Sequence, residues 1–147
     1  MTYLVAYLGI LVVYLVLDQV WLRAFMRPRL ARRLGEVVLE RPRLGATVGF
    51  GFFYAAVLTL LAAAPGLRAA AGPIYLERGP VAVDGWMLVI VLAASVGLFN
   101  YIARAAGNLA LLRGWGWSLA LIEVGWGIVA SVAAALAGYF LAGAWIG

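Results

Sequence analysis

The sequence of 147 residues contains no cysteine, no histidine and no lysine. The lack of cysteine excludes disulfides, thiolate nucleophiles and soft metal sites. The lack of histidine and lysine removes imidazole acid–base catalysis, the usual haem ligand, the common zinc ligand and Schiff-base chemistry. We therefore predict no catalytic residue, no metal and no cofactor, and the sequence leans away from an enzyme without deciding the question.

Charged residues are also scarce, since they make up 12% of the chain while hydrophobic residues make up 67%. A soluble domain of this size could not cover its surface with so few polar side chains. Every basic residue is an arginine, and the net charge is +5. Because the arginines lie between apolar runs, a lipid surface explains them better than nucleic acid does. We expect a membrane protein that contacts lipids and binds no nucleic acid.

Four apolar runs are long enough to cross a hydrocarbon core, which needs about 20 helical residues. They cover about residues 3–22, 44–64, 85–112 and 117–141. Within the last run, Trp117 and Tyr139 would lie roughly 33 Å apart along a helix, the distance between the aromatic belts of one bilayer. The sequence predicts an all-α integral membrane protein with four transmembrane helices in a single domain, residues 1–147.

The arginines also predict the orientation of these helices. The connection between the first two runs is the most basic, with Arg23, Arg27, Arg29, Arg32, Arg33, Arg41 and Arg43. The third connection carries two further arginines, whereas the two in the second connection are offset by two acids. By the positive-inside rule, the first and third connections are cytoplasmic and both termini lie outside.

The first connection contains a candidate amphipathic helix that begins at Pro28 and stops before Pro42. Leu30 and Leu34 fall on its apolar side, together with two valines. Such a helix would lie in the headgroup layer, with these side chains near anionic lipid: Arg29, Arg32 and Arg33. The alternative is that the segment only enforces topology and separates two spans.

The few polar residues within the runs fall at a similar depth. Asn100, Arg104 and Asn108 recur every four residues on one face of the third run. Asp18 lies near the cytoplasmic end of the first run, and Glu123 lies about 9 Å inside the start of the fourth. Since charged groups inside a membrane face the bundle interior, we predict a polar cluster at the cytoplasmic leaflet. Its members are Asp18, Asn100, Arg104, Asn108, Glu123 and Trp126.

Two of these acids belong to an acid-x-x-Trp pair, Asp18 with Trp21 and Glu123 with Trp126. Because the two runs are antiparallel, the indole N–H of one pair could reach the carboxylate of the other. The alternative is an internal ion pair of Arg104 with Asp18 or Glu123 that only locks helices together. Either pairing leaves one carboxylate that needs a proton, water, another partner or a ligand cation.

Small residues predict where helices pack closely. Small-x-x-x-small pairs occur in the second run at Gly45 and Gly49, and in the fourth at Gly127 with Ser131 and at Ala134 with Gly138. Because small residues occur on nearly every side of the fourth run, we expect this helix at the centre of the bundle or of an oligomer.

Three segments carry a family resemblance. They read Leu-Asp-x-x-Trp-Leu at 17–22, Gly-Asn-Leu-Ala-Leu-Leu-Arg-Gly-Trp-Gly at 107–116 and Ile-Glu-Val-Gly-Trp-Gly at 122–127. Together they resemble a family of predicted bacterial inner-membrane proteins catalogued as domain of unknown function 2177. The chain departs from that pattern at Ala105, Gly107, Leu111, Gly116 and Glu123, where the family has an acid, two threonines, a proline and an aspartate. The resemblance implies a multi-pass protein of the bacterial inner membrane and carries no established activity.

Three functions remain open. The first, which we slightly favour, is a non-enzymatic accessory or structural subunit that packs against a partner protein or against its own copies. The second is a protein that binds or modifies a lipid or isoprenoid through the polar cluster, with Arg104 holding the head group. The third is a proton-coupled small transporter that acts as a dimer.

Overall fold

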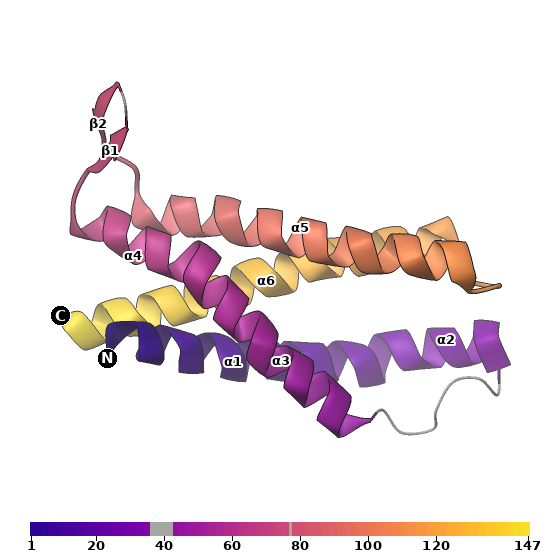
Figure 1. The fold of residues 1–147 in the computed structure, drawn as a ribbon. Helices are drawn as coiled ribbons and strands as arrows, with labels where there is room; N and C mark the ends of the chain where they lie inside the picture. The colour runs from indigo at the N-terminus through magenta and orange to yellow at the C-terminus, as the bar shows by residue number, and fades with distance from the viewer. Residues whose placement is uncertain (36–42, 77) are drawn as a thin grey trace.

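The computed structural model describes residues 1–35, 43–76 and 78–147. Within these residues, four helices are long and apolar enough to cross a membrane: Thr2–Leu34, Leu44–Ala71, Gly85–Leu111 and Trp117–Ile146. Figure 1 shows them running side by side along one axis, except that the second crosses the others at an angle. The predicted all-α membrane architecture with four spans is confirmed.

The first span is one continuous helix made of α1 (Thr2–Val20), the π-helical turn η1 (Trp21–Met26) and α2 (Arg27–Leu34). Pro28 follows directly on η1, and the wider π turn accommodates the proline inside the continuous helix. The predicted amphipathic segment is therefore described only as far as Gly35, and its helical part continues α1. Residues 36–42 of that segment lie outside the described residues, and its place at a membrane surface stays a prediction.

The second span consists of α3 (Leu44–Leu58), the π-helical turn η3 (Thr59–Ala63) and α4 (Ala64–Ala71). The sequence predicts that this span ends near residue 64, with the connection beginning at Pro65. The helix continues instead, since the wider π turn comes just where the proline ring would meet a preceding carbonyl. The Thr59 hydroxyl donates a 2.7 Å hydrogen bond to the Ala55 carbonyl in the same region.

A short hairpin, which was not predicted, joins the second span to the third. Its strands β1 (Ile74–Leu76) and β2 (Gly79–Val81) pair antiparallel and stand away from the helices (Figure 1). Helix α5 (Gly85–Leu111) follows, and a tight turn leads into α6 (Trp117–Ile146). Gly114 in that turn has φ 95°, which favours glycine, and an added Cβ would lie 3.1 Å from the Arg33 carbonyl oxygen.

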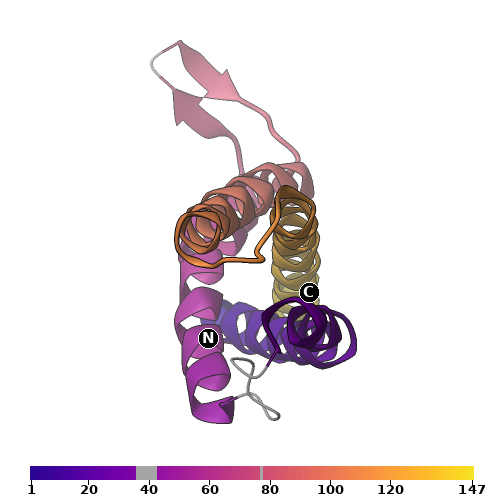
Figure 2. The same cartoon turned by 90° about the vertical axis from the view of Figure 1, so that its right-hand side faces the viewer.

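Helix α6 lies against both α5 and α1 and holds the bundle together (Figure 2). Its small residues permit these contacts: a Cβ on Gly138 would lie 2.5 Å from the Ala6 carbonyl, and one on Gly127 would fall 2.1 Å from the Tyr101 ring. Across the interface, Gly97 of α5 faces Ser131 in the same way. The predicted central position of the fourth helix is thus seen within the single chain.

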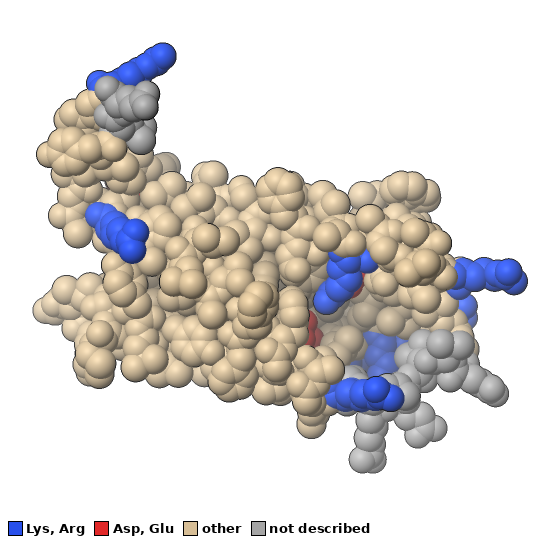
Figure 3. Space-filling model, in the orientation of Figure 1, with Lys and Arg blue, Asp and Glu red and all other residues tan. Residues whose placement is uncertain are grey.

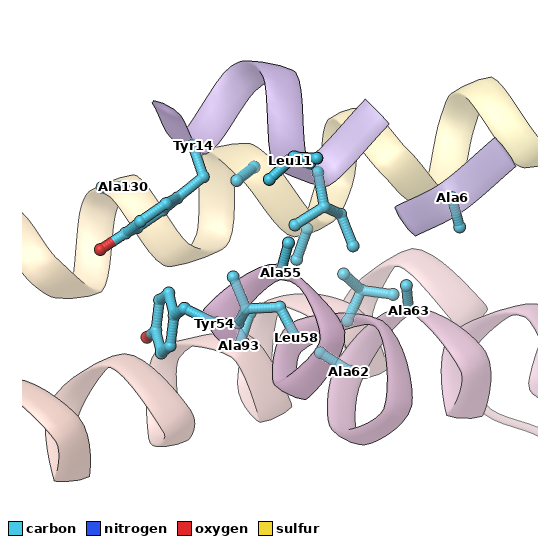
Figure 4. Packing of buried hydrophobic residues seen from close by; sticks show 14 of the residues in the cluster. Ala6, Leu11, Tyr14, Tyr54, Ala55, Leu58, Ala62, Ala63, Ala93 and Ala130 are labelled. Carbon is cyan, nitrogen blue, oxygen red and sulfur yellow. The ribbon is translucent and has the colours of Figure 1, made fainter. Parts of the chain in front are cut away.

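The main apolar core lies between α1, the second span, α5 and α6, and it is rich in alanine. Figure 4 shows two tyrosines, Tyr14 and Tyr54, at one edge of this cluster, with both hydroxyl groups directed away from the aliphatic side chains. Their ring centroids are 4.9 Å apart. Beyond this edge the packing changes from small residues to aromatic and polar ones.

Both termini lie at one end of the bundle, while α2 and the α5–α6 turn lie at the other (Figure 1). We call these the terminal end and the α2 end. Most arginines of the described residues belong to the α2 end, which agrees in pattern with the predicted topology. Which end faces the cytoplasm stays a prediction.

Candidate functional site: a polar cavity at the α2 end

A cavity forms at the α2 end because the second span leaves the bundle there. Its later part, η3 and α4, packs on α5, whereas α3 packs on α1 and diverges from α5 (Figure 1). The cavity that this leaves between the first span, α3, α5 and α6 has a volume of about 520 Å³. In the space-filling view, acidic side chains are visible in a hollow with arginine side chains around it (Figure 3).

Four of the six residues predicted to form the polar cluster line this cavity: Asp18, Arg104, Asn108 and Glu123. They come from α1, α5 and α6, so residues far apart in the chain share one site. Arg104 Nη2 donates a 2.5 Å hydrogen bond to Glu123 Oε1 and forms an ion pair with it. Of the two ion pairs that the sequence left open, the structure contains the one with Glu123.

The ion pair is unequally exposed. The Glu123 side chain is 4% exposed, whereas the Arg104 side chain is 44% exposed and reaches toward the opening. The second carboxylate oxygen, Glu123 Oε2, is buried and has no hydrogen-bond partner among the described residues. Asp18 is half-buried, and within the described chain it forms no hydrogen bond or ion pair. Among the residues that the structure describes, both carboxylates thus have an acceptor oxygen that no donor reaches.

A network of hydroxyl groups lies directly behind the ion pair. The Arg104 guanidinium lies 4.7 Å from the centre of the Tyr101 ring, and Tyr101 shares a 2.8 Å hydrogen bond with Tyr14. The Ser131 hydroxyl donates to the Gly127 carbonyl and therefore accepts from Tyr54, at 2.6 and 2.7 Å. These bonds satisfy the buried hydroxyls and fix the rear of the cavity.

The tryptophans do not behave as the sequence predicted. Trp21 stacks on Trp126, with ring centroids 4.6 Å apart and planes inclined by 4°, and it also stacks on Phe25 at 4.1 Å. Neither indole N–H has a hydrogen-bond partner among the described residues. The predicted hydrogen bond from an indole N–H to the opposite carboxylate is therefore wrong, because the two indole rings stack face to face instead.

Two predicted cluster members lie outside the cavity lining. Trp126 is held in the stack behind Trp21, and Asn100 lines a separate groove of about 480 Å³ between α3 and α5. Phe50 lines both the cavity and this groove, so the two spaces meet at its ring. Asn100 lies one helical turn before Arg104 on α5, and at that level α5 faces the groove and not the cavity.

The remaining walls of the cavity are mostly apolar. They are formed by Trp21, Leu22, Met26, Leu30, Leu34, Ala46, Phe50, Leu112 and Trp115, with Thr47 as the further polar residue. Trp115 is buried in a small cluster with Met26 and Leu119 and closes the end beside the α5–α6 turn. The site is therefore amphipathic, with three charged side chains among mostly apolar ones.

The arginines predicted to face lipid head groups lie on α2, beside the cavity. Arg29 stacks over the Phe25 ring at 3.2 Å and donates to the Phe25 carbonyl at the same distance. Arg32 and Arg33 are exposed, and Arg33 Nη2 lies 3.5 Å from the Ser118 hydroxyl. Their contact with lipid stays a prediction.

Sequence reasoning missed several residues of the site, chiefly Thr47, Phe50, Tyr101 and Trp115. Tyr101 precedes Arg104 by three residues, so the spacing on one helix face could have suggested it. Trp115 lies inside a segment already quoted for the family resemblance. Phe50 and Thr47 carried no signal, because an apolar span gives no indication of which side faces a cavity.

Comparison with known families matches residues 3–140 to the family described as "Predicted membrane protein (DUF2177)". The chain belongs to this family. The match covers nearly the whole chain, including every cavity-lining residue named above. No curated protein and no solved structure matches the chain. The family assignment confirms the resemblance found in the sequence and supports a small polytopic membrane protein.

Proposed function

We propose that this protein binds a membrane amphiphile, with the head group in the cavity at the α2 end. The observation that carries the proposal is the combination, in one space of about 520 Å³, of a charged wall and hydrocarbon walls. Ligand pockets of small molecules have volumes of about 300–1,000 Å³ and contain a few polar groups in mostly apolar surroundings. A lipid head group with its first methylenes fits this description.

The groove between α3 and α5 supports the same proposal. It is lined mainly by phenylalanine, leucine and valine side chains and meets the cavity at Phe50. A hydrocarbon chain that starts in the cavity could continue past Phe50 along the groove into the bilayer. The two π-helical turns support it too, since such turns are frequent at functional sites and η1 supplies Trp21, Leu22 and Met26 to the cavity.

The test is lipid retention by the purified protein. Wild type, Arg104→Ala and the control Arg68→Ala, which removes an exposed arginine at the terminal end, are extracted in a mild detergent and weighed by native mass spectrometry. We expect a bound lipid in wild type and Arg68→Ala and a loss of about tenfold in Arg104→Ala, because the charged part of the cavity then loses the ion pair that holds Glu123 in place. Equal retention by all three would rule out binding at this cavity.

An accessory subunit is the second candidate, and one observation favours it. Gly45 and Gly49 are exposed on α3, and a Cβ on either would meet nothing within 4 Å. Small residues on a span let another helix approach closely, so this face suits a helix of a partner. A specific polypeptide that co-purifies with wild type and is lost in Gly49→Leu would support this role. A chain that always isolates alone would contradict it.

A further inference from the structure

The charges in the cavity identify the class of head group. The charged side chains on its described walls are Asp18, Glu123 and Arg104. Two carboxylates against one guanidinium leave one negative charge, and Arg104 is already paired with Glu123. An anionic head group would therefore meet a wall of the same net sign, whereas a cationic one would complete the charge balance.

The unpaired atoms indicate that the cation also donates hydrogen bonds. Glu123 is 3% exposed, and its Oε2 atom has no partner among the described residues. A buried carboxylate oxygen that lacks a donor is costly, so a ligand that supplies one gains that free energy on binding. Asp18 lines the same cavity and adds a second carboxylate that no described residue binds. Among the described residues, the site thus offers carboxylates without a donor, beside the indole N–H groups of Trp21 and Trp115, which lack an acceptor.

The aromatic walls favour the same charge. Phe50 and Trp115 line the cavity, and aromatic faces attract cations, with tryptophan the strongest of them. Trp21 does not count here, because its ring is already stacked on Phe25 and Trp126. A primary ammonium has three N–H donors and fits beside two carboxylates. A quaternary ammonium would meet the aromatic rings equally well but has no N–H for Glu123 Oε2.

From these observations we infer that the cavity is selective for an amphiphile whose head group ends in a primary ammonium. This inference rests on the proposed lipid binding and adds the chemistry of the head group to it. The ammonium donates to Glu123 Oε2 and to the Asp18 carboxylate, while Arg104 holds Glu123 in place through Oε1.

The experiment measures competition between lipids of equal chain length. Purified wild type is incubated in mixed micelles with phosphatidylethanolamine, phosphatidylcholine and phosphatidylglycerol, and bound lipid is measured by native mass spectrometry. We expect retention of the ethanolamine lipid to exceed that of the other two by about tenfold, the effect of one hydrogen bond to a charged group. A preference for phosphatidylglycerol or phosphatidylcholine overturns the inference while lipid binding stands. If wild type retains no lipid at all, both proposals are overturned.

Isosteric variants test whether the two carboxylates cause the lipid selectivity. Glu123→Gln and Asp18→Asn keep side-chain volume but remove a carboxylate, and Asp84→Asn makes the same change in an exposed residue at the terminal end. We expect the ethanolamine preference to fall about tenfold in the first two and to stay unchanged in Asp84→Asn. If the preference survives in both cavity variants, the carboxylates do not select the head group and the inference is wrong. Asp18→Asn serves alone if Glu123→Gln does not fold, because Asp18 forms no hydrogen bond or ion pair with another described residue that the change would break.

Discussion

The terminal end and the α2 end of the bundle use the same helices in opposite ways. At the terminal end, α1 and α6 meet through glycine and alanine, with Gly138 set directly against Ala6 and Ile10. At the α2 end, the same two helices face each other across stacked indoles, Trp21 on Trp126, and α3 turns away to leave a cavity. Close backbone packing fills the terminal end, whereas large side chains keep the helices apart at the α2 end.

This contrast suggests how a small membrane protein can contain both a stable core and an open site. In lipid, helix association depends on close van der Waals contact more than on the hydrophobic effect. The small residues of the terminal end provide that contact, so the α2 end need not pack tightly. Charged side chains can then remain in a cavity without separating the helices.

The largest effect is expected at the closed end, from Gly138→Ala. The added Cβ would lie 2.5 Å from the Ala6 carbonyl oxygen, which is backbone and cannot move aside easily. We expect the free energy of unfolding to fall by about 3 kcal/mol from overpacking. The measurement is a denaturant titration in detergent, followed by circular dichroism. Gly143→Ala is the matched control on the same helix, since a Cβ there meets nothing within 4 Å. Equal stability of the two variants would refute close packing at Gly138.

The next effect concerns the ion pair at the open end. Arg104→Leu leaves the 4%-exposed Glu123 side chain without its partner, and we expect a loss of about 2 kcal/mol in the free energy of unfolding. The double variant Arg104→Leu with Glu123→Leu should regain most of it, because neither charge then remains buried. The same unfolding titration measures both. A double variant less stable than the single one would show that the pair stabilises the bundle, contrary to a role in the cavity.

A smaller effect is expected at the boundary between the two ends, where Tyr14 and Tyr101 share a hydrogen bond. Tyr14→Phe and Tyr101→Phe should each lower the free energy of unfolding by about 1 kcal/mol, since each leaves one buried hydroxyl unpaired. The double variant should cost less than the sum of the two, as expected for residues in contact. Tyr3→Phe, at an exposed position of α1, is the control. Additive losses would argue that the two hydroxyls do not act together.

The smallest effect is expected on the free face of α3. Gly45→Ala adds a Cβ into open space, and we expect a gain of about 0.5 kcal/mol from the higher helix propensity of alanine. Melting in detergent, monitored by fluorescence-detected size-exclusion chromatography, resolves such a change. A clear loss of stability, or a change in oligomeric state, would place this face in an interface and favour the accessory role.

Much of the fold could be predicted because its signals are local. Hydropathy gave four spans, and the glycines and alanines of the fourth span indicated its central position, now seen in its contacts with α1 and α5. The helix beyond Pro65 was missed, since the π turn that accommodates the proline has no clear sequence signature. The hairpin at β1 and β2 was missed as well, because its strands are only three residues long.

The charged side chains of the candidate cavity could be predicted from the sequence, whereas its apolar lining and its contacts could not. Rarity of charge pointed to Asp18, Arg104 and Glu123, and all three line one cavity. Spacing along a helix could not separate Asn108, which lines the cavity, from Asn100, which lines the groove. Nor could it choose between hydrogen bonding and stacking for Trp21 and Trp126, since that depends on how two helices rotate about their axes.

The sequence alone was enough to show that the chain lies in a membrane, where its four spans begin and which few side chains have to be sheltered from lipid. These properties follow from the free energy of moving each residue from water into hydrocarbon, which is a property of the local chain. It could not show that Arg104 pairs with Glu123 and leaves Asp18 free of a described partner, that the indoles stack, or that α3 diverges to open the cavity. Those outcomes depend on the fit of side chains from distant segments, and this fit exists only once the helices have packed.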